Sequence, residues 1–478
     1  MSRLQTVCNQ FFEVVKLSRS YQKLQPLWRV GLTFSSFILQ IIKDFKGEFY
    51  RKSFLAMVLQ LIGVGFQAVQ ERLKAINFAE SNTEQAYCPE SDIKFRAIQN
   101  FLLAIICFMP VIRDWSLLII PLILLFWWRT PTKWDTVDRY FTGFLFTLVT
   151  ATFFSRHWQT GLNHLATLVQ WIIIAWLVSR SIPRVMIAKI IKASVYSSAL
   201  WLIVGFWQLN AGVPTPTGWV EPGQALLIPV RISSVFVNPN IYSIYLLSII
   251  ISVYFLFFET KLKLEKLILS IIGIGSLIGL YFTYSRTGWL IVLLLAILIG
   301  WRHLKGLHWL RLVLLSLLVI VFLGVQTRIK ALINLEESTF GYRLKIWYGV
   351  VKALKDYWFW GGGPGSFELI YPYYRLKRII ADHAHQTYLQ FWLEYGIVNL
   401  LLFLAFVVNL LKTAFVNLGI KGAGKKDFYP QNALVLIVIL FLLAGFSETW
   451  YVNSYLGGYF WLNFGLLSAL LKGSCFNE

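Results

Sequence analysis

Long uninterrupted runs of apolar residues constrain this chain more than any other feature of its sequence. Three examples are Leu117–Trp128, Ile268–Phe282 and Leu434–Ala444. A run that is apolar on every side leaves no face for water, so it belongs in lipid or in a very deep core. Only 14% of the residues are charged, against about 25% in a typical soluble domain. The sequence therefore predicts an integral membrane protein.

The apolar runs after residue 96 predict an all-α fold, a polytopic transmembrane helical bundle of about twelve spans. We expect spans near residues 97–112, 115–128, 138–154, 162–179, 190–208, 240–258, 267–283, 287–301, 309–325, 386–411, 430–447 and 455–471. Alternate short connections are rich in Lys and Arg, as at residues 261–266 and 302–311. Basic connections stay in the cytoplasm. This bias predicts that both termini are cytoplasmic.

This layout divides the chain into four regions. Residues 1–96 mix basic and apolar residues, which predicts a cytoplasmic region or one lying on the membrane surface. Within it, residues 54–69 are apolar but short for a span, so we expect an interfacial segment. Residues 97–325 hold spans 1–9. Residues 326–385 form a large outside-facing loop between spans 9 and 10, and residues 386–478 hold spans 10–12 and a short cytoplasmic tail.

The net charge of +21 could suggest a nucleic-acid partner. Basic connections on the cytoplasmic side of a membrane protein explain it better, and no recognition helix or RNA-binding motif accompanies it. We therefore expect membrane lipids and no nucleic acid among its partners. The four cysteines are scattered and form no CxxC pair, so they predict no metal or redox site. No cleaved signal peptide is expected, because the N-terminus lacks a short apolar core with a small-residue cleavage site.

Unusual residues gather on the predicted outside face. Arg231 precedes Asn238-Pro239-Asn240 at the mouth of a span. Ser285 and Arg286 lie in a very tight connection between two apolar segments. An arginine costs about 2.5–3.5 kcal/mol at the centre of a membrane, so each arginine should have a partner or a role. The simpler alternative is an interfacial anchor that reaches toward lipid phosphates.

The large loop carries Arg343, the run Gly361–Gly365, and then His383 and His385. The glycine run lacks the Gly-Lys-Ser/Thr of an ATP-binding loop. Its amides, including those of Gly363 and Gly365, could hold a phosphate, although a plain tight turn would give the same pattern. A metal site would need further ligands beside the two histidines, so we predict none.

A neutral histidine can act as a base near pH 7, and arginines suit a diphosphate. Each histidine taken alone could equally be a solvated loop residue. Taken together, these residues predict a site for an anionic, phosphate-bearing lipid at the outer leaflet.

In these motifs the chain resembles the bacterial O-antigen ligase and polymerase superfamily over roughly residues 200–411. The resemblance rests on the following residues: Arg231 with Asn238-Pro239-Asn240, Tyr284–Trp289, Arg343 to Trp347, Gly361–Phe367, His385-Gln386, Glu394 and Gly396. The family's twelve-helix layout and its large periplasmic loop are similar to the layout expected here. This chain departs from the pattern at Asn399, where the family usually has glycine.

The resemblance implies a glycosyltransferase of the bacterial inner membrane that needs no metal, nucleotide or other cofactor. It would transfer a glycan from an undecaprenyl diphosphate carrier to a hydroxyl of a glycan or lipid acceptor. His385, Arg286 and Arg231 would be catalytic. His385 would act as the base and the two arginines would bind the diphosphate. Arg343, Gly363, Gly365, Asn240 and Ser285 would bind substrate.

Other readings of the sequence stay open. Residues 219–240 are also similar to a cyanobacterial branch named as inorganic carbon (bicarbonate) transporters. Coupled transporters usually place ionisable residues inside their spans, whereas Glu394 is the only acidic residue in the predicted spans six to ten. A structural scaffold would not explain the polar residues on one face. Ligation to lipid A-core, polymerisation of repeat units and transfer to a protein are not separated.

Overall fold

The computed structural model describes residues 100, 102–107, 118–119, 122–123, 134, 136–215, 230–303, 339–376, 379–420 and 428–472. All of them belong to one compact unit, Pro89–Glu478. The basic N-terminal region predicted at 1–96 and the span predicted at 309–325 lie outside the described residues. The same holds for most of the two spans predicted at 97–112 and 115–128.

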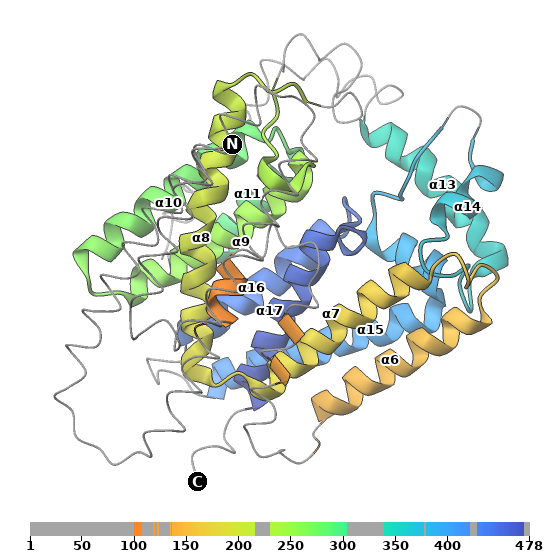
Figure 1. Cartoon of the computed structure of the whole chain (residues 1–478), viewed down its shortest axis with the longest axis horizontal. Coiled ribbons are helices and arrows are strands. Elements are labelled where there is room, and N and C mark those ends of the chain that lie inside the picture. Colours follow the sequence, from red (N-terminus) through yellow and green to blue (C-terminus); the bar gives the residue numbers. More distant parts are fainter. Residues whose placement is uncertain are drawn as a thin grey trace, which may run out of the picture. The chain divides into compact units, whose positions relative to one another are not determined.

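The described residues are helical and contain no strand, in agreement with the predicted all-α class. Their main helices are α6 (Thr136–Phe154), α7 (Leu162–Ser181), α8 (Arg184–Asn210), α9 (Pro239–Glu259), α10 (Lys263–Phe282), α11 (Arg286–His303), α13 (Thr339–Tyr357), α14 (Phe367–Tyr374), α15 (Thr387–Ile420), α16 (Phe428–Ala444) and α17 (Ser454–Lys472) (Figure 1). Two short 3₁₀ turns, η4 (Ser234–Phe236) and η5 (Trp450–Val452), complete them. Nine of the predicted spans coincide with one of these helices.

Five helices among the described residues are long and apolar enough to cross a membrane: α7, α8, α9, α10 and residues 387–416 of α15. Helix α16 contains a shorter apolar segment, Pro430–Ala444. Helix α9 is the most apolar of the five and has most of its residues buried, whereas only a minority of the residues of α10 are buried inside the protein. Helix α9 is therefore central, and α10 offers a surface suited to lipid. The total of about twelve spans and their orientation stay predictions.

Close helix packing builds the core. Helix α7 packs along α17, α9 packs against α10 and α16, and α6 packs against α15. The α7–α17 contact depends on small residues. A Cβ on Gly457 would come within 2.2 Å of the Trp171 ring, and one on Gly465 within 2.5 Å of the Ala175 carbonyl oxygen. Glycine at these two places lets the backbones approach, as is common between membrane helices.

The described part of the predicted outside loop is folded. Helices α13 and α14 share a small apolar cluster that includes Ile346, Val350 and Phe367 and reaches Leu393 of α15. The glycine run connects these two helices. This small core fixes the loop region onto α15. The sequence analysis predicted a loop here and did not predict the two helices.

A buried ion pair joins α6 to α7. Arg180 Nη1 donates to Asp138 Oδ2 at 2.8 Å, and their side chains are only 3% and 1% exposed. Trp176 Nε1 donates to the other oxygen of Asp138 at 3.0 Å. Arg180 therefore lies inside the helix packing.

Replacing Asp138 with leucine should lower the free energy of unfolding by about 3–5 kcal/mol, because Arg180 would stay buried without its counter-charge. Chemical unfolding of the purified protein in detergent measures this loss. The double variant Asp138→Leu with Arg180→Met leaves no buried charge and should recover much of the stability. A double variant as unstable as the single one would show that the pairing of charges is not what stabilises this contact.

Candidate functional site

The carboxylate of Glu448 is the centre of a polar cluster. Glu448 follows α16 and is 2% exposed. Its Oε1 accepts hydrogen bonds from Asn240 Nδ2 at 2.8 Å and from Arg343 Nη2 at 2.9 Å. Its Oε2 lies 3.8 Å from His385 Nδ1. One buried acid thus joins three of the residues singled out in the sequence, which come from α9, α13 and the turn before α15.

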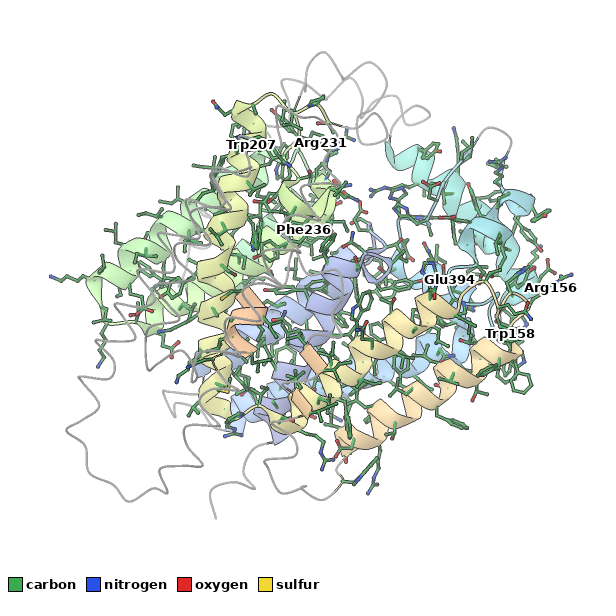
Figure 2. All side chains as sticks on the ribbon, viewed as in Figure 1. Arg156, Trp158, Trp207, Arg231, Phe236 and Glu394 are labelled. Carbon is green, nitrogen blue, oxygen red and sulfur yellow. The ribbon has the colours of Figure 1, made fainter. Side chains whose placement is uncertain are left out.

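Asn240 extends this cluster to Arg231. Arg231 Nη2 donates to Asn240 Oδ1 at 3.0 Å, and Arg231 Nε donates to the Thr283 carbonyl oxygen at 2.9 Å. The guanidinium is therefore held between the first turn of α9 and the connection that leads into α11 (Figure 2). Arg231 and His385 are linked through Asn240 and Glu448.

Local sequence explains why Asn240 sits at a helix start. Asn238 is the N-cap of α9, and its side chain accepts from the backbone N–H groups of Asn240 and Ile241. Pro239 occupies the first turn, where its missing N–H costs nothing. The Asn-Pro-Asn motif therefore begins the helix and presents the Asn240 amide to the site.

Ser285 and Arg286 lie at the start of α11. Ser285 Oγ is 3.0 Å from Ser243 Oγ on α9 and accepts from the Gly288 N–H at 3.2 Å. Ser243 also donates to the Asn240 carbonyl oxygen at 2.6 Å. Ser285 therefore packs the start of α11 onto the first turn of α9, and Arg286 follows it directly.

Left-handed backbone occurs beside each of these motifs. Val237, Tyr284 and His385 have φ values of 64°, 51° and 50°. Such values are uncommon for residues other than glycine and are strained for a β-branched residue such as Val237. The three residues adjoin Asn238, Ser285 and the base candidate itself. Packing of the surrounding fold holds this strain where the polar groups converge.

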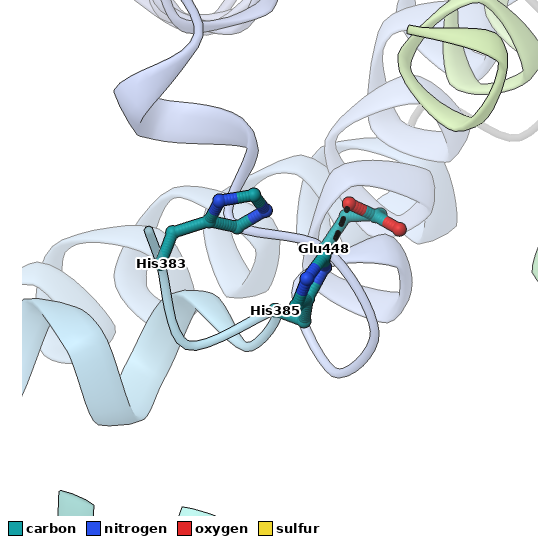
Figure 3. A group of neighbouring side chains, drawn as sticks. All are labelled: His383, His385 and Glu448. Atoms are coloured by element: carbon teal, nitrogen blue, oxygen red, sulfur yellow. Dashed lines mark ion pairs between the residues drawn. The ribbon is translucent and has the colours of Figure 1, made fainter. Parts of the chain in front are cut away.

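Residues 383–385 form the histidine turn, which is held by contacts on both sides. The rings of His383 and His385 are 4.0 Å apart between centroids. Trp347 Nε1 donates to the Ala384 carbonyl oxygen at 3.0 Å. The Thr387 hydroxyl donates to the Glu448 carbonyl oxygen at 2.7 Å. Figure 3 shows the two histidines with Glu448, and the dashed line marks its ion pair with His385.

The cluster sets the charge of its members. Burial alone would raise the pKa of Glu448, but the nearby His385, Arg343 and His383 lower this pKa to about 2. Burial lowers the pKa of His383 to about 4, and the charges of His385 and Arg343 act in the same direction. Near pH 7, Glu448 is therefore an anion and His383 is neutral.

The protein should lose stability as the pH falls from about 7 to about 5. His383 titrates near 4 when folded and near 6.5 in its ordinary state, so in this window the unfolded chain binds a proton that the folded chain excludes. The expected loss in free energy of unfolding is on the order of 1–2 kcal/mol. Thermal unfolding in detergent at both pH values measures it. His383→Gln should show a shallower pH dependence, and an unchanged slope in that variant would contradict the assignment.

His383, His385 and Glu448 have ligand atoms within 4.8 Å of one another and could hold a metal ion by distance. The sequence analysis predicted no metal because it lacked this third ligand. The surrounding charge opposes a cation, since Arg343 and Asn240 already bind Glu448 Oε1. A metal ion would have to compete with a guanidinium. The arrangement suits an anion beside the arginines better than a cation between the histidines.

The glycine run packs on a break in α15. Gly396 has φ 79° inside that helix, and a Cβ there would lie 1.9 Å from the Phe359 carbonyl oxygen. Gly362 N–H donates to the Leu393 carbonyl oxygen at 2.7 Å, and Gly363 N–H to that of Glu394 at 3.0 Å. The loop thus supplies donors to carbonyl groups where the helix is interrupted.

The phosphate-binding role of Gly363 and Gly365 stays a prediction. Gly363 N–H donates to the Glu394 carbonyl oxygen, so a phosphate would have to displace that carbonyl group to bind the Gly363 amide.

Sequence reasoning missed Glu448, although a signal was available. Glu448 is an acidic residue in the short connection between the last two predicted spans, and the charge bias had placed that connection on the same outside face as His385. Thr449 in the same connection accepts the Gln386 N–H at 3.1 Å. Both residues brace the start of α15.

Residues 271–404 match the family model described as O-antigen ligase. The matched segment includes Ser285, Arg286, Arg343 and His385, whereas Arg231, Asn240 and Glu448 lie outside it. The match confirms the resemblance to this superfamily and supports a membrane glycosyltransferase of the ligase or polymerase type. It gives no support to the resemblance to carbon transporters. No curated protein is a significant match to the chain.

Proposed function

We propose that this protein, with its O-antigen ligase segment, transfers a glycan from an undecaprenyl diphosphate carrier to an acceptor hydroxyl. The reaction would take place on the outer face of a bacterial inner membrane. One observation carries the proposal. His385 and Arg343 contact the same buried carboxylate, and Asn240 links Arg231 to it. A base and cationic groups thus share one anchor.

In this proposal the arginines bind the carrier diphosphate. Arg343 donates to Glu448, and Arg231 donates to Asn240, which in turn donates to Glu448. Arg286 begins the helix α11, and the connection before it accepts from Arg231. Guanidinium groups bind phosphate oxygens through paired, charge-assisted hydrogen bonds. In the transition state they would stabilise the negative charge that grows on the departing diphosphate.

His385 is the proposed base for the acceptor hydroxyl. Its Nδ1 faces Glu448 Oε2, which leaves Nε2 as the atom that takes the proton from the acceptor hydroxyl. The hydroxyl oxygen then bonds to the anomeric carbon as the bond from that carbon to the diphosphate oxygen breaks. The electron pair of that bond leaves with the carrier diphosphate, and the sugar carbon inverts. Glu448 would stabilise the imidazolium formed in this step.

Binding of carrier lipid tests the arginine assignment. Purified protein in detergent should bind undecaprenyl diphosphate in the presence of chelator, and Arg231→Ala should bind it about 10–100-fold more weakly, because charged hydrogen bonds are worth about 1.5–3 kcal/mol each. Lys355→Ala, on the exposed end of α13, is the matched control for loss of one positive charge. Equal binding by wild type and Arg231→Ala, or binding only with added metal, would contradict the proposal.

A further inference from the structure

Glu394 is a buried carboxylate that the proposed chemistry does not use. It is 2% exposed and lies in α15, two residues before the break at Gly396. Figure 2 labels it beside the helices of the loop region. A buried acid needs partners, because an ionised carboxylate is costly to remove from water.

Two side-chain donors meet the Glu394 carboxylate. Gln390 Nε2 donates to Oε1 at 3.0 Å, and the Tyr451 hydroxyl donates to Oε2 at 2.8 Å. The carboxylate therefore joins α15 to η5.

Both donors lead to the proposed catalytic groups. Gln390 Oε1 accepts the Ala384 N–H at 2.7 Å, and Ala384 lies between His383 and His385. Tyr451 lies in η5, three residues after Glu448. Glu394 is thus connected to the histidine turn through Gln390 and, through Tyr451, to the turn at residues 448–451 that carries Glu448.

We propose that Glu394 is a positioning residue that fixes the spacing between His385 and Glu448. The proposal rests on the proposed function, in which these two groups act together. His385 needs such support because its φ of 50° is unfavourable for a residue other than glycine. The Glu394 carbonyl oxygen also accepts the Gly363 N–H, so one residue joins the glycine run to the reacting groups.

The two donors suit a carboxylate at this place. Gln390 presents an N–H group and Tyr451 an O–H group, and a carboxylate can accept at both of its oxygens. The variant Glu394→Gln keeps the size of the side chain but turns an NH₂ group toward one of these donors. We expect this mismatch to loosen both turns while leaving the arginines of the carrier site in place.

The test compares E394Q with wild type by two readouts. Hydrogen–deuterium exchange of segments 379–390 and 445–453 needs no substrate, and E394Q should speed exchange in both. Glycan transfer should show kcat lowered by about 10²-fold, as expected for a small misplacement of reacting groups, with KM for the carrier-linked donor unchanged. A double variant with Gln390→Met should be no worse than E394Q, because both changes break one connection.

Asn399→Ala is the matched control on the same helix. Asn399 is 1% exposed and donates to the Thr147 carbonyl oxygen, away from both turns. Its loss should leave exchange in both segments and kcat unchanged. The proposal is overturned if E394Q exchanges like wild type at the two turns, or if N399A produces the same changes. A wild-type protein that transfers no glycan would refute the proposed function, while the exchange data would still decide whether Glu394 couples the turns.

Discussion

Replacing His385 with alanine should lower kcat for glycan transfer by about 10²–10⁴-fold, the usual contribution of a positioned general base. The acceptor hydroxyl would lose the imidazole that takes its proton, while the cationic groups that bind the diphosphate would remain. KM for the carrier-linked donor should therefore change little. Steady-state transfer with purified protein, measured over a range of donor concentrations, gives both values.

His164→Ala is the control for loss of a histidine. His164 is exposed on α7 and does not contact Glu448 in the structure, so its replacement should leave transfer close to wild type. If His385→Ala transferred glycan at the wild-type rate, another group would have to be the base. His383, the neighbouring imidazole, would then be examined first.

Replacing Glu448 with glutamine should lower kcat by about 10²–10⁴-fold, by comparison with the carboxylate that orients the catalytic histidine of serine proteases. Glutamine would remove the negative charge that stabilises the imidazolium of His385. It would also leave Arg343 without its ionic partner, so the melting temperature should fall as well. Transfer kinetics and thermal unfolding of the same preparation measure the two effects.

Glu368→Gln is the matched control for this variant. Glu368 is an exposed acid in the first turn of α14, and removing its charge should affect neither transfer nor melting temperature. A Glu448→Gln variant with wild-type kcat and a lowered melting temperature would show that Glu448 stabilises the fold without assisting the reaction.

The sequence predicted the helices well because each depends on a local property. An apolar run long enough to cross lipid forms a helix wherever it lies in the chain. Asn238-Pro239-Asn240 likewise predicted the mouth of a span, and the structure shows this motif starting α9. Helix α13 was missed although Ile346, Val350 and Ala353 repeat at helical spacing, because the charged residues between them resembled a loop.

The site could be predicted only in part. Arg231, Asn240, Arg343 and His385 stood out because polar residues are unusual next to apolar spans, and the structure joins all four through Glu448. The joining residue itself carried no local pattern, since it is 63 positions from His385. The glycine run shows the same limit. Its composition indicated a turn with available amides, but which acceptor they bind is decided by tertiary packing against α15.

The central claim is that a base and cationic groups around Glu448 transfer a glycan without a metal ion. The most direct measurement gives purified wild-type protein an undecaprenyl diphosphate-linked oligosaccharide and candidate acceptors in the presence of chelator. We expect one carrier diphosphate to be released for each glycan transferred. Absence of transfer with every donor and acceptor tried, or transfer only after a divalent metal is restored, would contradict the account.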